Sequence, residues 1–473
     1  MTNQHRNKAV SADQVIEESH LKRHLKSRHI LLMALGSTIG VGLFLGSGTA
    51  IAHAGPSILL AYLLAGVVAF IVLRALGEMA VHNPIAGSFA HYAHEYVGPL
   101  AGYLVGWGYW FYWVIVGVAE VSAVGIYMGI WFPEMPQWIW AISSLIFMGG
   151  LNFIAVKLFG EFEFWFALIK VFAIIAIIAF GGMVIFFGLS NGGVPLGLTN
   201  LWGNGGFFPT GFDGFLFSLQ MALFAYVGIE MIGLSAGEAE NPEKTLPMAI
   251  DSLIIRIVVF YGGALLVILC IYPWNEMGSQ GSPFVVMFER MGLKEAAGVV
   301  NFVVITAALS SCNAGIFSGG RLLMGLAQKG FAPAQMKKIS KTGVPSLAVI
   351  ATVSTAIVGS ILNFFVPEKA FIWATSAVTL IGLCVWLVIL MTQLQFRKKL
   401  SQEQLDGLTY KSILWPYSIW FAIAFILLVI FIMCIHPEGI IGLIVGVPII
   451  LFLVLIYYLK GFNKKEYLGQ KTN

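Results

Sequence analysis

Long apolar segments alternate with short polar ones along almost the whole chain. Each segment has roughly the 20 residues that an α-helix needs to cross the hydrocarbon core of a bilayer. The pattern therefore predicts an all-α integral membrane protein with twelve transmembrane helices in one domain at 30–459, between polar tails at 1–29 and 460–473. The predicted helices lie at residues 30–53, 57–77, 100–130, 138–157, 163–188, 212–235, 254–274, 296–327, 346–365, 369–394, 415–435 and 439–459.

The composition agrees with a membrane protein. Of the 473 residues, 58% are hydrophobic and 11% are charged, whereas about a quarter of the residues of a soluble domain are charged. The four cysteines all fall inside apolar segments without CxxC spacing, which favours packing over a disulfide frame. His91, His94 and Glu95 lack the HExxH order of a metal site, so we expect an interfacial helix at 87–97. We expect no metal, no cofactor and no nucleic-acid partner.

Basic residues predict the orientation. With a cytoplasmic N-terminus, 23 of the 27 Lys and Arg residues lie on the inner side, and only Arg290, Lys294 and Lys369 lie outside. Lys170 lies within the fifth helix. Since cytoplasmic loops carry the excess of Lys and Arg, both termini are predicted in the cytoplasm, and the protein in the cytoplasmic membrane. The uncharged loop 189–211 would then form an ordered cover on the outside.

The first apolar segment carries five glycines between Gly36 and Gly48. Each glycine costs a helix about 0.8–1 kcal/mol relative to alanine, so this helix is expected to break. A broken helix at membrane depth exposes N–H groups that bind a substrate carboxylate in several transporter folds. The same glycines also suit close helix packing, and both interpretations stay open. A dinucleotide fingerprint does not fit, because no strand surrounds the stretch.

The sixth segment is weakened in the same way, between Phe224 and Gly233. Glycine-interrupted helices at matching places in two halves of a chain indicate an inverted repeat with a central site. Helices 1–5 and 6–10 would form the two halves, and helices 11 and 12 would be accessory.

Three ionisable residues lie where the membrane penalises charge, at about 2.5–3.5 kcal/mol for a residue at the helix centre. Lys170, about two turns into the fifth helix, either snorkels to the interface or gains and loses a proton during transport. Glu230, after the sixth-helix break, either holds freed backbone groups or relays a proton. Glu120 is expected to line a pocket. Ser310, Ser311 and Asn313 of the eighth helix either join helices or hydrogen-bond a proton site on the fifth helix.

Several motifs together resemble one family. They are Leu35–Phe44, Phe224–Glu230, Gly237-Glu238-Ala239, Phe162–Phe166 and Pro273-Trp274-Asn275. These stretches resemble bacterial amino acid permeases of the amino acid–polyamine–organocation superfamily, close to the proline, threonine/serine and aromatic permeases. The likeness covers nearly the whole chain.

The resemblance implies a LeuT-type five-plus-five inverted repeat and proton-coupled uptake of a neutral L-amino acid. It places the substrate carboxylate on the N–H groups around Gly40, Val41 and Gly42, and the proton on Lys170. The implied substrate-binding residues are Ser37, Thr38, Ile39, Gly40, Val41, Gly42, Trp113, Gly117, Glu120, Phe224, Ala225, Val227 and Gly228. The implied proton-coupling residues are Lys170, Glu230, Ser310 and Ser311. Val41 departs from relatives that have Ser or Thr there, so only backbone contacts remain at this position.

The expected partners are the amino acid, the proton and membrane lipids, without an obligate protein partner. Two alternatives remain within the resemblance: an exchanger without proton coupling and a membrane nutrient sensor. An enzyme is disfavoured, because no nucleophile–base or metal constellation is visible at membrane depth.

Overall fold

The computed structural model describes residues 39–85, 88–153, 156–234, 241–277, 282–340 and 343–463, and these residues form helices and connections without strands. The first half comprises α3 Val41–Phe44, α4 Gly46–Ala54, η1 Gly55–Ser57, α5 Ile58–His82, α6 Ser88–Tyr92, η2 Ala93–Val97, α7 Pro99–Trp131, α8 Gln137–Asn152, α9 Val156–Phe187, α10 Asn200–Gly203, α11 Gly211–Phe224 and α12 Met231–Leu234. The second half comprises α13 Pro242–Asp251, α14 Leu253–Ile255, η4 Arg256–Gly263, α15 Ala264–Ile271, η5 Trp274–Glu276, α16 Pro283–Arg290, α17 Lys294–Gln328, η6 Ala334–Lys337, α18 Ser346–Ser360, α19 Leu362–Phe365, α20 Pro367–Lys399, α21 Gln402–Asp406, α22 Tyr417–Ile435 and α23 Pro437–Leu459.

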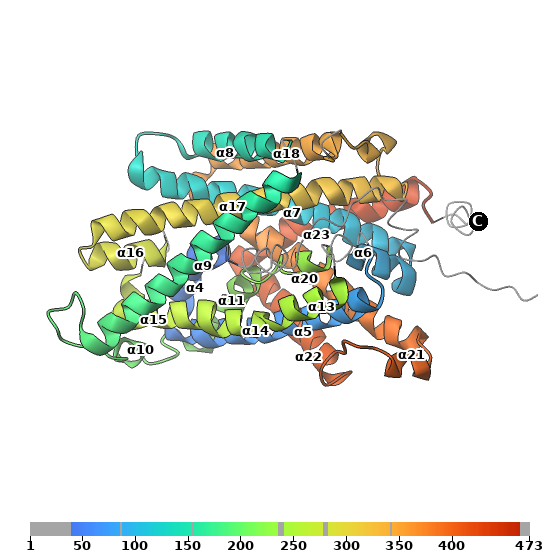
Figure 1. Ribbon diagram of the computed structural model, residues 1–473. Helices are drawn as coiled ribbons and strands as arrows, with labels where there is room; N and C mark the ends of the chain where they lie inside the picture. The colour runs from blue at the N-terminus through green and yellow to red at the C-terminus, as the bar shows by residue number, and fades with distance from the viewer. Residues whose placement is uncertain are drawn as a thin grey trace, which may run out of the picture.

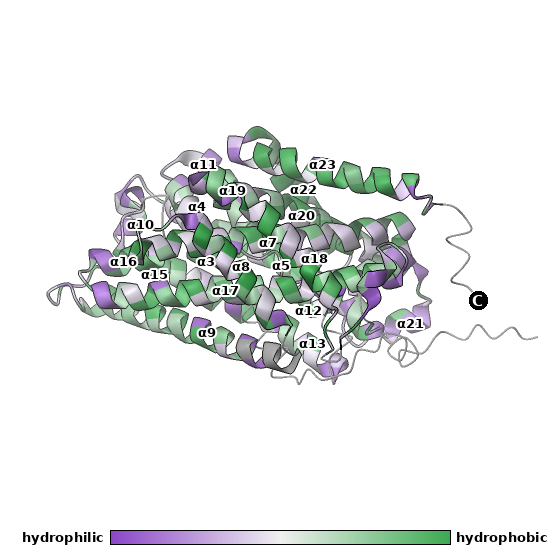
Figure 2. Ribbon diagram, turned by 90° about the horizontal axis from the view of Figure 1, so that it is seen from above, coloured by the Kyte–Doolittle hydropathy of each residue, from purple (hydrophilic) through white to green (hydrophobic). Residues whose placement is uncertain are grey.

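The long helices lie side by side along one axis, and α9 crosses them obliquely (Figure 1). Two ends of the bundle can be told apart: one carries α6 and α21, and the other carries α10 and α16. We call them the α21 end and the α10 end. Hydrophobic residues run along the helices, and hydrophilic residues gather toward the two ends (Figure 2). This distribution is that of a bundle whose middle is surrounded by lipid.

Nine helical stretches in the described ranges are long and apolar enough to cross a membrane, which confirms the prediction of an all-helical, multi-pass membrane protein. Three features explain why nine such stretches are found where twelve transmembrane helices are predicted. The first and second predicted helices form one stretch, Val41–His82, joined through η1. The fourth, α8, has 16 residues, and the sixth is split into α11 and α12. The count of twelve and the inverted repeat stay predictions.

The centre of the bundle is the contact between α7 and α17, with α20 packed on α7. Small residues on α17 bring neighbouring helices close. A Cβ added to Gly319 would lie 2.7 Å from Thr352 of α18, and one added to Gly315 would lie 3.0 Å from the Trp113 ring of α7. Close approach through small residues is the usual way in which helices pack in a membrane.

The loop 189–211 packs over the α10 end of the bundle. Trp274 of η5 donates its indole N–H to the carbonyl oxygen of Asn204 (2.8 Å), and the Thr210 hydroxyl donates to the carbonyl oxygen of His53 (2.6 Å). The Trp202 and Phe207 rings lie 5.4 Å apart. The predicted ordered cover is therefore present, and the predicted helix at 87–97 is present as α6 and η2 in its described part.

Candidate functional site

The described part of the first predicted helix begins with a bend and is divided into α3 and α4. Ile39 and Gly40 form a bend, Gly40 has extended backbone angles (φ −124°, ψ −162°), and α3 begins at Val41. Because the first N–H groups of a helix have no partner within it, Val41 and Gly42 present theirs at the start of α3. Ser37 and Thr38, the other predicted binding residues of this stretch, lie outside the described residues.

The sixth helix is interrupted at matching depth. α11 ends at Phe224 and α12 begins at Met231. Gly228 lies between them with φ +109°, a conformation that glycine adopts far more readily than other residues. A Cβ on Gly228 would also lie 2.9 Å from the Tyr112 hydroxyl oxygen of α7. Both sterics and backbone conformation therefore require glycine at this break.

The two breaks touch each other. A Cβ on Gly42 would lie 2.7 Å from the Cα of Ala225. We call the contact between Gly42 and Ala225 the crossing. A tyrosine hydroxyl binds the backbone on each side of it: Tyr62 donates to the carbonyl oxygen of Gly42 (3.2 Å), and Tyr261 donates to that of Ala225 (3.0 Å). The crossing thus brings a helix N-terminus and a row of turn carbonyls together inside the protein, where an anion and a cation can both be bound.

A carboxyl group already lies at the start of α3. Glu120 of α7 is 4% exposed, and its carboxyl group interacts with the Ser311 hydroxyl and the Val41 backbone N–H. Its Oε1 lies 3.2 Å from the position of a Cβ on Gly40. Glu120 Oε2 has no partner among the described residues. The start of α3 therefore accommodates a carboxylate, the group that every amino acid carries.

Aromatic side chains enclose the crossing. Trp113 packs on Gly315 of α17, and its ring lies 3.8 Å from the position of a Cβ on Gly228. Within the described residues its buried indole N–H has no hydrogen-bond partner. Phe224, at the end of α11, is 7% exposed and meets Phe371 of α20 edge-on, with ring centroids 6.5 Å apart.

The predicted site residues Gly117 and Val227 do not face the crossing. The nearest atom to a Cβ on Gly117 belongs to Ala356 of α18, at 3.9 Å, so Gly117 lies at the contact between α7 and α18. The Val227 side chain packs on Gly382 of α20. Val227 can therefore contribute only its backbone to the crossing, and Gly117 is not brought against α3 or the sixth-helix break.

Lys170 lies deeper than predicted. α9 begins at Val156, 14 residues before Lys170, because the helix extends seven residues beyond the predicted start at 163. Lys170 is fully buried, and its Nζ donates to the Ser310 hydroxyl oxygen at 3.0 Å. The alternative of a lysine that snorkels to the interface is therefore wrong for this conformation.

A buried glutamate joins this lysine, and the sequence analysis did not single it out as a site residue. The Ser310 hydroxyl donates to Oε1 of Glu163 at 2.8 Å, and Glu163 is 1% exposed. Asn313 also interacts with Glu163, and its side-chain oxygen accepts a hydrogen bond from Asn152 of α8 at 2.8 Å. The available signal was spacing: Glu163 precedes Lys170 by seven residues, which places both on one face of a helix.

Glu230 holds the sixth-helix break together. Its Oε2 accepts the backbone N–H of Gly228 (3.0 Å) and the indole N–H of Trp386 of α20 (2.9 Å). The carboxyl thereby satisfies a donor freed by the break and ties it to α20. These contacts favour the interpretation in which Glu230 holds freed backbone groups over the one in which it relays a proton.

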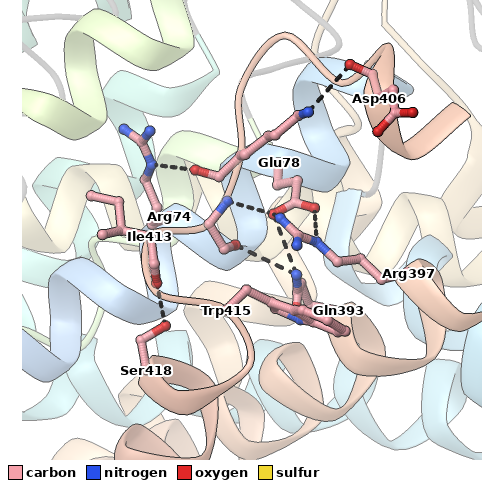
Figure 3. A network of polar contacts seen from close by, with 10 residues as sticks. Arg74, Glu78, Gln393, Arg397, Asp406, Ile413, Trp415 and Ser418 are labelled. Carbon is pink, nitrogen blue, oxygen red and sulfur yellow. Dashed lines mark hydrogen bonds and ion pairs between the residues drawn. The ribbon is translucent and has the colours of Figure 1, made fainter. Parts of the chain in front are cut away.

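A second polar network lies at the α21 end (Figure 3). Glu78 of α5 is fully buried and accepts two hydrogen bonds from Arg397 of α20 (2.6 and 2.9 Å) and one from the backbone N–H of Ser412 (2.7 Å). Arg74 donates to the carbonyl oxygen of Lys411 (2.9 Å). The segment between α21 and α22 is thus fastened to α5 and α20.

The described residues contain no group of three or more His, Cys, Asp or Glu that could hold a metal ion. His91 lies 3.6 Å from Glu95 as a pair on one short helix.

Comparison with known proteins agrees with this geometry. The sequence model of the family described as "Amino acid permease" matches residues 29–468. Three proteins of Bacillus subtilis (strain 168) are similar over almost their whole length. An uncharacterized amino acid permease, YtnA, is 53% identical over 95% of this chain and 97% of its own. A probable threonine/serine transporter, YbxG, is 48% identical over 94% and 96%, and the amino-acid permease AapA is 43% identical over 95% and 96%. The relatives indicate a transporter rather than an enzyme. The chain therefore belongs to the amino acid permease family, and it is a multi-pass membrane protein that transports amino acids.

Proposed function

We propose that this permease is a symporter that imports a neutral L-amino acid across the cytoplasmic membrane together with a proton. The observation that carries the proposal is the contact of the two broken helices at Gly42 and Ala225. The start of α3 offers N–H groups to the substrate carboxylate, and the carbonyls of the sixth-helix break offer acceptors to its ammonium group. Glu120 lies on the same N–H of Val41 and must share or yield it when substrate binds.

The proposed architecture is the one that the resemblance implies. Twelve helices form two inverted halves, helices 1–5 and 6–10, with helices 11 and 12 accessory and both termini in the cytoplasm. The α21 end is then cytoplasmic, in keeping with Arg74 and Arg397 there (Figure 3) and with Lys411, which contacts Arg74 and Asp406 of α21. Phe224 and Trp113 exclude water from the bound substrate, and the proton resides on Lys170.

Threonine and serine are the substrates to test first. Glu120 Oε2 and the Trp113 indole N–H are buried and unpaired within the described residues. Leaving a polar group buried without a partner costs about 1–3 kcal/mol, and a hydroxyl can both donate to a carboxylate and accept from an indole. A hydroxyl-bearing substrate would recover this cost. The 48% identical relative named as a probable threonine/serine transporter supports the same choice.

The test is uptake of radiolabelled threonine into proteoliposomes under an imposed pH gradient, with each standard amino acid as competitor. Symport predicts accumulation that depends on the gradient and collapses with a protonophore. Uptake that requires an internal amino acid and ignores the gradient would establish an exchanger instead. Binding without flux would establish a sensor.

A further inference from the structure

We propose that Glu163 is the proton acceptor of a relay that begins at Lys170, passes through the Ser310 hydroxyl, and leads away from the substrate. The inference rests on the proposed proton coupling through Lys170 and adds a residue and a direction to it.

The three groups form a continuous hydrogen-bonded line. Lys170 Nζ and Ser310 Oγ are 3.0 Å apart, and Ser310 Oγ and Glu163 Oε1 are 2.8 Å apart. Lys170 and Ser310 are fully buried and Glu163 is 1% exposed. The direction of the bonds is consistent, since Ser310 accepts from the amine side and donates to the carboxyl side.

A serine hydroxyl in this position can pass a proton without changing itself, because it both accepts and donates. As an N–H bond of the Lys170 ammonium breaks, the Ser310 oxygen gains that proton and its own proton moves to the Glu163 carboxylate. The products are a neutral amine and a neutral carboxylic acid. The Lys170–Glu163 pair is neutral before and after transfer, so no uncompensated charge is created at membrane depth, where it would be costly.

Position along α9 sets the direction. Glu163 lies seven residues nearer the start of α9 than Lys170, which is about 10 Å at 1.5 Å per residue. Glu163 also interacts with Asn313, which accepts a hydrogen bond from Asn152 at the end of α8. Glu163 Oε2 has no partner among the described residues, which leaves it open to a water that carries the proton onward.

The other carboxylate near Lys170, that of Glu120, lies on the side of the proposed substrate site. Glu120 also interacts with Lys170, but it lies against Gly40 and interacts with Ser311 and with Val41 at the start of α3. Two consecutive serines of α17 thus contact different carboxylates. Ser311 interacts with Glu120, on the side of the substrate, and Ser310 donates to Glu163, on the side to which the proton is released. In the proposed orientation the release side is the cytoplasm.

The test compares two assays in the same proteoliposomes: accumulation driven by a pH gradient, and counterflow, in which substrate exchanges without net proton movement. Glu163→Gln and Ser310→Ala should lower accumulation by about tenfold or more, the scale of a lost proton-transfer group. Counterflow should stay within about twofold of the wild type, since the substrate contacts remain. Ser310→Thr keeps a hydroxyl and should restore accumulation. A merely structural serine or glutamate would lower both assays together.

Two results would overturn the relay. In the first, Glu163→Gln and Ser310→Ala still accumulate substrate with unchanged pH dependence, while Lys170→Ala no longer accumulates it. The proton would then leave Lys170 by another route. The other is an equal loss of accumulation and counterflow in Ser310→Ala. If the wild type shows no gradient-driven uptake, the proposed symport itself fails, and the relay fails with it. Should Glu163→Gln not fold, the Ser310→Ala and Ser310→Thr pair decides alone.

Discussion

Gly42 of α3 and Ala225 of the sixth-helix break are in backbone contact, so close that a Cβ on Gly42 would lie 2.7 Å from the Ala225 Cα. The obstruction is backbone, which a rotamer change cannot relieve. Gly42 is therefore needed for the two breaks to meet. The packing interpretation of the glycine stretch and the substrate interpretation are thus compatible, because close packing brings together the groups of the proposed site.

We expect Gly42→Val to abolish uptake while membrane insertion stays near normal. The valine side chain would push the two breaks apart and displace the N–H groups at the start of α3, and a misplacement of about 1 Å can cost two orders of magnitude in rate. The matched control is Gly129→Ala on α7, where a Cβ meets nothing within 4 Å. Measured uptake per inserted protein checks the prediction; wild-type affinity in Gly42→Val would contradict it.

Gly228→Ala should lose activity for two separable reasons. A side chain at φ +109° is strained by about 1–3 kcal/mol, and its Cβ would lie 2.9 Å from the Tyr112 hydroxyl oxygen. Adding Tyr112→Phe removes the clash but not the strain, so the double variant should recover part of the loss. Gly182→Ala, with open space around it, serves as the control. No recovery in the double variant would show that strain alone governs the position.

Glu120→Gln and Trp113→Ala should reorder the preference among amino acids. Each residue lies beside the crossing and carries a buried polar atom without a hydrogen-bond partner among the described residues, and a substrate side chain that pairs with this atom gains affinity. Hydroxyl-bearing substrates should lose most in both variants. Competition profiles of radiolabelled uptake measure the order; a uniform loss with the order unchanged would mean that both residues are structural.

Breaking the Glu78–Arg397 ion pair should destabilise the protein strongly. Glu78→Gln leaves Arg397, whose side chain is only 12% exposed, without its counter-charge, and breaking a buried ion pair costs about 3–5 kcal/mol. The control is Glu276→Gln, because Glu276 and Arg290 form a pair 3.6 Å apart with more than half of each side chain exposed; such pairs contribute about 0–1 kcal/mol. Thermal unfolding in detergent compares the two. Equal shifts would contradict the assignment of the Glu78 network as an anchor.

The topology can be tested by cysteine labelling in intact cells. In a variant whose four native cysteines are replaced by alanine, Lys338→Cys should resist an impermeant thiol reagent and Val194→Cys should react. Both positions are exposed, so reactivity reports the side of the membrane. Labelling of the cysteine at 338 from outside would overturn the proposed orientation.

Much of the fold was predictable from local pattern. A run of apolar residues must be helical in lipid, because only a helix satisfies its own backbone there, and so the segments appear in the sequence. The bend at Gly40, before α3, agrees with the same local reasoning, since glycine weakens a helix wherever it stands. The exact number of membrane crossings did not follow, because η1 joins two helices with few polar residues between them.

Pairs distant in sequence were decided by the tertiary structure alone. In the sequence, Lys170 is an unfavourable charge in an apolar helix; in the structure it donates a hydrogen bond to Ser310, 140 positions later. In the sequence, Glu78 is an ordinary carboxylate near a helix end; in the structure it is paired with Arg397, 319 positions away. The sequence by itself determined where the chain is helical and where it breaks, because those depend on neighbouring residues. Which broken ends meet, and which buried charges are paired, depended on the packing of distant helices.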